Sequence, residues 1–597
     1  MYVYKAILLL KFNRIKKEKK MLKTLLKSVR EFKKSTILTP IFMMLEVFME
    51  ILIPFLLSVL IDKGIGSGDI SKMISISFML VIAATLALIF GVASGKSAAK
   101  ASSGFAKNLR QDVYNKIQEF SFYNIDKFST SSIVTRLTTD ITNLQQAYMM
   151  TIRGAVRAPA TIIFAIIMSF LTNVKIGFIY LIAAPILGFL LIFIANYVRP
   201  IFKKVFKKID KLNCIVQENV RAIRVVKSFV TEEKEIKKFN ETSEEIYQNF
   251  SRAEKILAFN SPIMQFMIYT CLTLISFFGA KFIVSGSLTT GELASLFSYV
   301  MQMLNSLMLL SMVFVMITMS IESGKRVVEI IDEIPDLANK ENPITEVKSG
   351  KIEFENVGFS YVKDKNKEVL KNINLIINSG ETVGIIGGTG DGKSSLVNLI
   401  PRLYDATEGK VKVGDIDVKD YDIKILRDQV SMVLQKNELF SGTIKDNIKW
   451  GKENATDDEI IEVCKLAQAD EFISGFPEKY DTKIEQGGSN VSGGQKQRLC
   501  IARALLKRPK ILILDDSTSA VDTKTDSLIR KAFNEKIPDT TKIIIAQRVS
   551  SIQDADKIIV MNNGKIQAIG KHDDLIKTNE MYKEIYFSQV KGSEIDE

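Results

Sequence analysis

The sequence predicts an all-α transmembrane domain of six helices, followed by an α/β domain that carries a helical subdomain. Three observations lead to this prediction. The first 334 residues contain six apolar segments, each close to the roughly 20 residues that a helix needs to cross a bilayer. Residues 383–396 form a short apolar run that enters a glycine-rich loop. Further short apolar runs follow, each ending in a polar residue, as buried parallel strands do.

The composition fits two unlike halves. The chain has 597 residues, which is enough for several domains. It combines 47% hydrophobic with 25% charged residues, an average that indicates one apolar and one ordinary half. Much of the net charge of +13 lies beside the apolar segments, which favours membrane lipid over nucleic acid as its partner. Four widely separated cysteines indicate neither a disulfide framework nor a zinc site.

Residues 1–34 are predicted to form a basic extension and an amphipathic helix that lies on the cytoplasmic membrane surface. The first 20 residues place their charges after the apolar part and lack a small-residue cleavage site, which argues against a signal peptide. Met21 is therefore expected to be the more natural start.

The transmembrane domain is predicted to occupy residues 35–334. Its second and fourth links are roughly 60 residues long and basic, whereas the other links are short. Basic links stay in the cytoplasm, so both long links, the N-terminus and everything after the sixth span are expected inside a multi-pass cell-membrane protein. Apolar residues at helical spacing make the long links helical, with short turning helices near 122–128 and 218–229. The spans are placed near 36–61, 73–95, 157–173, 176–198, 261–284 and 292–320.

Two features inside the spans could concern a substrate. Glu46 and Glu50 lie one helical turn apart, and the cost of a carboxylate in the bilayer predicts that they face the bundle or a wet cavity. Internal hydrogen bonding is favoured over substrate contact. A methionine stripe in the sixth span fits plain packing better than a cavity for varied apolar ligands. Its members are Met301, Met303, Met308, Met312, Met316 and Met319.

A polar, proline-containing linker at 335–350 precedes the second domain, residues 351–597. There an apolar strand enters the pattern G-x-x-x-x-G-K-S, whose glycines let backbone N–H groups point at phosphate oxygens. Lys393 can reach the β- and γ-phosphates, and the Ser394 hydroxyl can bind Mg²⁺. The motif predicts an α/β P-loop nucleotide-binding domain with ATP and Mg²⁺ as its ligands. Its residues are Gly387, Gly388, Thr389, Gly390, Asp391, Gly392, Lys393, Ser394 and Ser395.

Other polar residues stand where the same ligand could use them. Tyr361 could stack on adenine, with core packing as the alternative. Gln435 and Asp515 end apolar runs and could hold Mg²⁺, and Gln435 could instead position water. Two glycines before a basic amphipathic helix predict a second anion-binding helix N-terminus. That segment is Val491, Ser492, Gly493, Gly494 and Gln495; it is followed by Ser519, Ala520, Val521 and Asp522, and by Gln547 after a last buried strand.

In this order and at this spacing, the motifs resemble those of the ATP-binding-cassette family: phosphate loop, glutamine loop, signature (491–495), acidic strand and D-loop (519–522). With six preceding spans, the chain resembles an exporter-type half-transporter. The resemblance implies that two such chains pair, with each ATP held between one chain's phosphate loop and the other's signature. It also implies that the turns near 122–128 and 218–229 are coupling helices.

The chain departs from the family pattern in its catalytic positions. Asp516 stands where the family has the glutamate that orients or deprotonates water, and Gln547 replaces the histidine that contacts the γ-phosphate. The shorter carboxylate is withdrawn by about 1.5 Å, and a misplacement of 1 Å can cost roughly 10²-fold in rate. Glutamine is neutral and cannot carry a proton. Val491 replaces the usual leucine, and Asp391 stands where small residues are usual.

These departures predict a pocket that binds ATP but hydrolyses it poorly, as in the degenerate subunit of a heterodimeric exporter. Hydrolysis would occur mainly on the partner half-transporter's ATP, completed by Ser492–Gln495 of this chain. The alternatives are a homodimeric exporter with slow ATPase and an ATP-gated regulator or channel subunit. The apolar spans hint at a small lipophilic cargo, a drug or a lipid. His572, the one histidine, is expected in a surface turn at a helix start.

Overall fold

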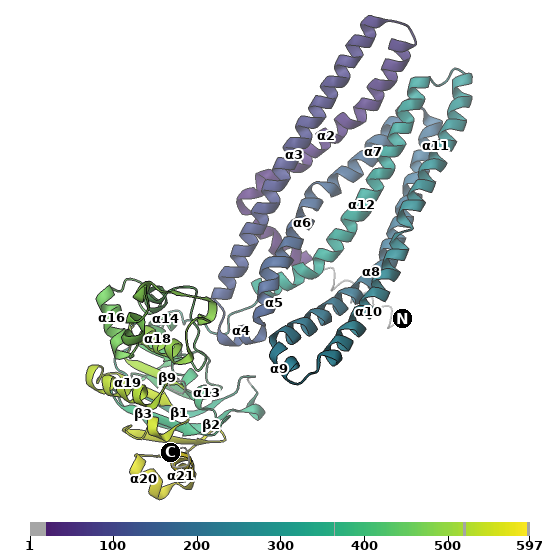
Figure 1. The fold of residues 1–597 in the computed structure, drawn as a ribbon. Helices are drawn as coiled ribbons and strands as arrows, with labels where there is room; N and C mark the ends of the chain where they lie inside the picture. Colours follow the sequence, from purple (N-terminus) through teal and green to yellow (C-terminus); the bar gives the residue numbers. More distant parts are fainter. Residues whose placement is uncertain (1–18, 363, 517–520, 594–597) are drawn as a thin grey trace. The chain divides into compact units, whose positions relative to one another are not determined.

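The computed structural model describes residues 19–362, 364–516 and 521–593 (Figure 1). Contacts divide the chain into two compact units. The helical unit consists of residues 1–118 and 130–333, and the α/β unit consists of residues 119–129 and 334–597.

The helical unit confirms the predicted all-α membrane domain. Among its described residues, six stretches are long and apolar enough to cross a membrane: Lys19–Ile65, Ile70–Gln118, Thr130–Thr172, Val174–Arg221, Glu232–Val284 and Thr290–Ile331. Their main helices are α2 (Lys33–Val59), α3 (Ile70–Gln118), α5 (Thr130–Thr135), α6 (Ile141–Ile152), α7 (Gly154–Thr172), α8 (Val174–Arg221), α9 (Ile223–Ser228), α10 (Glu232–Leu257), α11 (Asn260–Val284) and α12 (Thr290–Ile331).

The long basic links are helical, as predicted. The helix α3 alone has 49 residues, which at about 1.5 Å per residue is far longer than the roughly 30 Å of a bilayer core. The helix α9 corresponds to the short turning helix expected near 218–229, although α8 continues to Arg221 before it. The spans therefore extend well beyond the membrane on the basic side of the chain.

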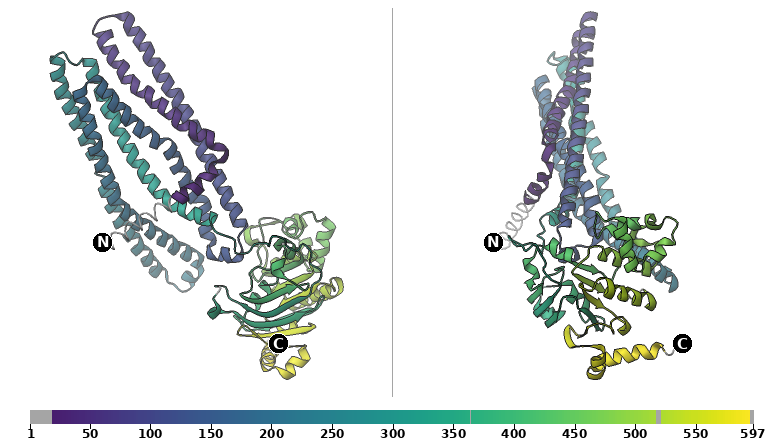
Figure 2. Two further views of the ribbon diagram at one scale, coloured as in Figure 1. Left: turned by 180° about the vertical axis from the view of Figure 1, so that it is seen from behind. Right: turned by 90° about the vertical axis from the view of Figure 1, so that its left-hand side faces the viewer.

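Local signals explain where the short links turn. Asn173 caps α8 by accepting hydrogen bonds from the backbone N–H groups of Lys175 and Ile176. Thr289 and Glu292 form a reciprocal capping box at the start of α12. Figures 1 and 2 show α2 beside α3, and α8 beside α10 and α11. The apolar core between helices includes fully buried Tyr180 and Tyr299.

The described residues of the α/β unit form three sheets. The main sheet has the order β12-β11-β3-β10-β9-β6, in which only the edge pair β11–β12 is antiparallel. An antiparallel sheet has the order β2-β1-β4-β5, and β7 pairs with β8. The strands are β1 (Ile352–Phe359), β2 (Leu370–Ile377), β3 (Thr382–Gly387), β4 (Glu408–Val413), β5 (Ile416–Asp417), β6 (Val430–Val433), β7 (Gly442–Thr443), β8 (Lys483–Ile484), β9 (Ile511–Asp515), β10 (Thr541–Ile545), β11 (Lys557–Asn562) and β12 (Lys565–Gly570).

The central strands are apolar throughout because both faces of the main sheet are covered. Along β9, Ile511 and Ile513 join the core shared with the antiparallel sheet, while Leu512 and Leu514 join the core under the helices. The helices of the unit are α4 (Phe122–Lys127), α13 (Lys393–Asn398), α14 (Ile423–Gln429), α15 (Ile444–Lys449), α16 (Asp457–Leu466), α17 (Asp470–Ser474), α18 (Gly493–Leu505), α19 (Thr523–Lys536), α20 (His572–Thr578) and α21 (Glu580–Ser593).

The short helix α4, predicted near 122–128, packs with the α/β unit. The Asn124 side chain donates a hydrogen bond to the Ile334 carbonyl and accepts one from the backbone N–H of Asp336. The Tyr404 hydroxyl donates to the Asp126 carboxylate at 2.8 Å. Side-chain hydrogen bonds therefore tie the turn between α3 and α5 to this unit.

Candidate functional site

Topology brings the predicted site residues together. The parallel strands β3, β9, β10 and β6 end at Gly387, Asp515, Ile545 and Val433. Because neighbouring parallel strands end at the same edge of the sheet, the phosphate loop, Asp515, Asp516, Gln547 and Gln435 all follow that edge. This edge is where ligands bind in open α/β sheets.

The phosphate loop has a backbone that requires glycine. Gly390 and Gly392 have φ of +93° and +87°, in the left-handed region. A Cβ atom on Gly392 would lie 2.8 Å from the Leu370 side chain and 3.2 Å from the Val369 carbonyl oxygen. Gly392 is also the N-cap of α13, so the loop leads directly into the helix N-terminus.

Lys393 folds back over the loop. Its Nζ donates hydrogen bonds to the carbonyl oxygens of Gly387 and Gly388 at 2.8 and 2.7 Å. Partial burial lowers the pKa of the Lys393 amine, and the nearby carboxylates of Asp391, Asp516 and Asp515 oppose this shift. The ammonium group is thus held at the loop, where phosphate oxygens would meet it.

Ser394 and Asp515 form an oxygen pair that fits Mg²⁺. The Ser394 hydroxyl donates a hydrogen bond to the Asp515 carboxylate at 2.9 Å. Burial raises the pKa of Asp515, and Asp516 raises it further, whereas the Ser394 hydrogen bond lowers it. A hydroxyl and a buried carboxylate are hard oxygen ligands of the kind that Mg²⁺ prefers, so a cation would relieve the cost of burying this charge. When bound, the ion would supply Lewis-acid stabilisation of phosphate oxygens.

Asp516 is held by two amides. Gln547 Nε2 donates to Asp516 Oδ2 at 2.7 Å, and Gln435 Nε2 makes a long contact with the same oxygen at 3.4 Å. The Asp516 backbone has φ of +48° and donates its N–H to the Ile545 carbonyl at 3.1 Å. Gln435 therefore contacts Asp516 in addition to following the strand edge.

The two amides contact one oxygen of the Asp516 carboxylate, and neither glutamine can carry a proton onward. One N–H of the Gln547 amide is already engaged in the hydrogen bond to Asp516. The two departures that the sequence revealed thus meet in one hydrogen-bonded cluster.

Asp391 has a structural role that the sequence did not explain. Its Oδ2 accepts a hydrogen bond from the Gly388 N–H at 2.5 Å, and its Oδ1 accepts one from the Asn563 N–H at 2.9 Å. The side chain is almost fully buried. Asp391 therefore links the phosphate loop to the turn between β11 and β12 through hydrogen bonds.

The Asp391→Ser substitution is expected to destabilise the α/β unit by about 1–3 kcal/mol, because two charge-assisted hydrogen bonds are lost. Trp450, the one tryptophan of the chain, lies in this unit. The urea midpoint of Trp450 fluorescence measures the loss, with Asp428→Ser, at an exposed aspartate, as the matched control. Equal midpoints for the two variants would contradict the assignment.

Tyr361 reaches the first turn of α13. Its hydroxyl is 2.9 Å from Ser395 Oγ, and its ring meets Tyr404 edge to face at a centroid distance of 5.1 Å. Tyr404 also contacts Phe122 of α4 at 6.0 Å. Burial and the hydrogen bond to Asp126 raise the pKa of Tyr404. Sequence reasoning missed Tyr404, although an aromatic residue shortly after the phosphate-loop helix was a visible signal.

The signature segment begins α18, away from the strand edge. Ser492 is the N-cap and forms a reciprocal capping box with Gln495 at 2.9 and 3.2 Å. Gly493 and Gly494 form the first helical turn, and Val491 packs against the apolar core. The segment thus offers a capped helix N-terminus without bulky side chains, suited to an anion.

Of the D-loop residues, Ser519 and Ala520 lie outside the described residues. Val521 is buried, and Asp522 caps α19 by accepting a hydrogen bond from the Thr525 N–H at 2.9 Å. His572 begins α20, as predicted, and its Nδ1 is 2.7 Å from the Tyr582 hydroxyl. This histidine therefore has a packing role beside α21.

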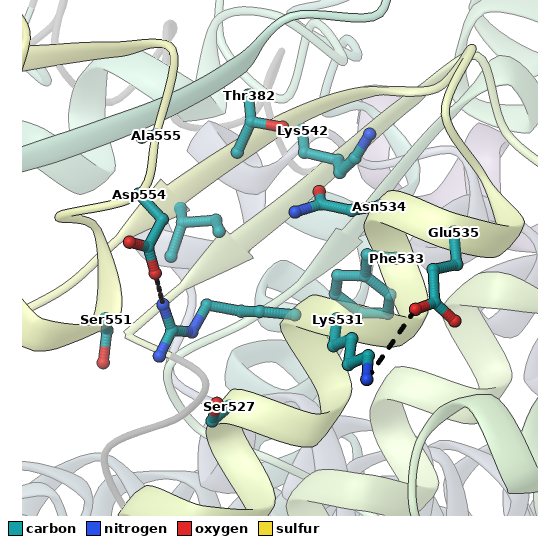
Figure 3. Close-up of a pocket in the computed structure, with 12 residues that line it drawn as sticks. Thr382, Ser527, Lys531, Phe533, Asn534, Glu535, Lys542, Ser551, Asp554 and Ala555 are labelled. Atoms are coloured by element: carbon teal, nitrogen blue, oxygen red, sulfur yellow. Dashed lines mark hydrogen bonds and ion pairs between the residues drawn. The ribbon is translucent and has the colours of Figure 1, made fainter.

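Figure 3 shows a cavity of about 290 Å³ at the opposite ends of strands β3 and β10. Its charged groups pair with each other: Arg530 with Asp554 at 3.1 Å and Lys531 with Glu535 at 4.0 Å. The buried Lys542 donates to two backbone carbonyls. These charged groups are ion-paired or hydrogen-bonded within the chain, although Arg530 Nε lacks a hydrogen-bond partner among the described residues.

Comparisons with known proteins agree with this geometry. A family model described as ABC transporter transmembrane region matches residues 36–307, and one described as ABC transporter matches residues 370–519. The chain is 36% identical over 556 residues to the ABC transporter ATP-binding protein YfiB of Bacillus subtilis, covering 93% of this chain and 96% of that protein.

Two further relatives carry descriptive names. YgaD of Bacillus subtilis, whose name describes a multidrug export ATP-binding/permease protein, is 32% identical over 95% of this chain and 99% of its own. An ATP-dependent lipid A-core flippase of Syntrophus aciditrophicus is 32% identical over 82% of this chain and 81% of its own. Among solved structures, a bacterial Atm1-family ABC exporter with ATP bound matches the fold with a TM-score of 0.79 and 22% identity, over 96% of this chain and 99% of that one.

Proposed function

The chain belongs to the ABC transporter family, as a multi-pass cell-membrane exporter with a cytoplasmic ATP-binding domain, and from this premise we propose that its own ATP site binds nucleotide but hydrolyses it poorly. The observation that carries the proposal is the cluster of Asp516, Gln547 and Gln435 beside an intact phosphate loop. Lys393, Ser394 and Asp515 retain the groups that hold ATP and Mg²⁺. The Asp516 carboxylate, which would take a proton from water, is one bond shorter than glutamate and has two glutamine amides on one of its oxygens.

The proposal extends to a heterodimer with a second half-transporter. The signature segment Ser492–Gln495 is intact, and in this family that segment serves the partner's ATP. An intact signature beside an impaired pocket supports a dimer in which one ATP site hydrolyses nucleotide and the other retains it. Hydrolysis then occurs mainly at the composite site made by the partner's phosphate loop and this chain's α18, while ATP in this chain's pocket is retained.

The proposed cargo is a small lipophilic or amphipathic molecule. The relatives named for multidrug export and for lipid A-core flipping support this class. The six apolar spans give such a cargo access from the lipid phase. ATP hydrolysis on the partner side would drive its export.

The decisive test compares ATP turnover of the purified chain with that of the chain assembled with its partner half. The isolated chain is expected to hydrolyse ATP at no more than roughly a hundredth of the rate of the pair, from the cost of a displaced base. Asp516→Asn in this chain should leave the rate of the pair unchanged. Nucleotide recovered from this chain's pocket after several turnovers should be ATP rather than ADP.

Each alternative predicts a different result. A homodimeric exporter in which Asp516 is a weak base would lose its turnover with Asp516→Asn. A regulator or channel subunit would not concentrate a transported probe inside inverted vesicles when ATP is added. Full exporter turnover by the unaltered chain alone would overturn the proposal.

A further inference from the structure

A cavity of about 560 Å³ lies within the helical unit, between α2, α7 and α12. Its lining is mostly polar, although these helices cross the membrane. Glu50 comes from α2, Arg157 and Thr161 from α7, and Gln302 and Asn305 from α12. Polar groups gathered around a cavity at membrane depth indicate a functional site.

Glu50 and Arg157, which line this cavity, belong to an ion-pair triad whose third member, Glu46, is buried and does not line it. Arg157 donates to Glu46 at 2.7 Å through Nη1, and to both oxygens of Glu50 at 2.7 and 2.8 Å through Nη2. The two glutamates thus hydrogen-bond internally, as the sequence led us to expect. The sequence did not identify Arg157 as their partner.

Two carboxylates share one guanidinium, so the triad has a formal charge of −1 with both glutamates ionised. Glu46 is buried, and among the described residues its Oε2 has no hydrogen-bond partner; the same is true of Gln302 Oε1. Glu50 and Arg157 are about one-third exposed toward the cavity. Both η-nitrogens of Arg157 are engaged by the glutamates, and Gln302 contributes an oxygen without a hydrogen-bond partner among the described residues.

The cavity lies deep in the bilayer. Glu50 is nine residues before the end of α2, and Gln302 is twelve residues after the start of α12. At about 1.5 Å per residue these positions are roughly 14 and 18 Å from the outer helix ends, near the middle of a core about 30 Å thick. An unmatched charge there is costly, and a cationic ligand would offset that cost.

The methionine stripe does not form this cavity. None of its six members lines it. Met303 is fully buried in the helix core, whereas Met308 and Met312 are about half exposed on the unit's surface. The apolar part of the lining comes instead from Ile53, Pro54 and Leu57 of α2 and from Leu309.

We propose that this cavity binds the cationic group of an amphipathic cargo, a protonated amine or a quaternary onium ion attached to an apolar body. The negative charge of the Glu46–Arg157–Glu50 triad attracts either cation, the side-chain oxygens of Gln302 and Asn305 accept hydrogen bonds from a protonated amine, and the aliphatic residues contact the apolar body. The inference rests on the proposed export function and refines its cargo from lipophilic to cationic.

The test measures equilibrium binding of tetraphenylphosphonium and tetraphenylborate, two ions of the same shape and opposite charge. The full-length chain in nanodiscs is dialysed against each labelled ion without ATP, and empty nanodiscs give the partition blank. Blank-corrected tetraphenylphosphonium binding should be at least about tenfold tighter, since one net charge acts at short range in a low-dielectric site.

Two variants change the charge of the cavity in opposite directions. Glu50→Gln removes one charge and should weaken tetraphenylphosphonium binding by about tenfold. Asn305→Asp, at an exposed lining position, adds one charge and should strengthen it by a similar factor. If Glu50→Gln does not fold, Asn305→Asp and the comparison of the two ions still decide the question.

Equal binding of the two ions by the unaltered chain would overturn the inference, as would an Asn305→Asp variant with unchanged binding. Binding is measured without nucleotide, so this result does not depend on Asp516 or on a partner. A failed cation test would leave the proposed ATP asymmetry standing, and fast turnover by the isolated chain would leave the cation site standing.

Discussion

Replacing Asp516 by glutamate together with Gln547 by histidine is expected to raise ATP hydrolysis in this chain's own pocket by roughly 10²-fold. The longer side chain returns the carboxylate to the place where it can act on water. The substitution of Gln547 removes the amide that now donates to Asp516 at 2.7 Å, and an imidazole can carry a proton near neutral pH. Single-turnover hydrolysis of radiolabelled ATP by the purified chain measures the gain.

Three controls separate this gain from a general effect. Each single substitution should recover only part of the rate, because the two side chains touch and act together. Adding Lys393→Met to the double variant should abolish the gain by removing the phosphate ligand. A double variant that binds ATP normally but remains as slow as the unaltered chain would contradict the assigned cause of impairment.

The second large effect is expected at the signature. Ser492→Arg in this chain should lower the ATPase rate of the assembled pair by roughly 10²-fold, the cost of losing a preorganised donor at a reacting phosphate. Lys393→Met in the same chain should lower it much less, because that pocket only retains ATP. The steady-state ATPase of the two variant pairs, measured side by side, gives the comparison.

A matched control lies on a neighbouring helix. Thr456 and Glu459 form the same kind of capping box at the start of α16 as Ser492 and Gln495 do at α18. Thr456→Arg should cost similar helix stability, about 1 kcal/mol, without touching nucleotide. If Thr456→Arg lowered the ATPase rate as much as Ser492→Arg does, the effect of Ser492→Arg would be explained by lost helix stability and not by a contact with nucleotide.

Much of the α/β site could be predicted because its parts are local. The loop from Gly387 to Ser394 is contiguous in sequence, and its glycines indicate the left-handed backbone conformation that they adopt. Asp515 and Gln547 follow apolar strands, and parallel pairing brings those strand ends together without further information. The sequence motif and the parallel pairing of the strands were therefore enough to predict that these residues lie together.

The contacts that escaped prediction join residues far apart in the chain. Asp391 meets Asn563 across 172 positions, and Arg157 meets Glu46 across 111. Nothing local distinguishes these partners from other polar residues, because their pairing depends on how hairpins and helices pack. Arg157 also lies at the edge of an otherwise apolar span, so the sequence did not indicate that its side chain would face Glu46 and Glu50.

The cysteines have a practical consequence. Cys214, on the cytoplasmic extension of α8, is exposed, whereas Cys271, Cys464 and Cys500 are buried. Burial raises the pKa of Cys464 to about 12 and also raises that of Cys500, so both thiols stay protonated and unreactive near neutrality. A maleimide dye should therefore attach at one position of the natural polypeptide. Fluorescence could then follow that helix during turnover without first removing any thiol.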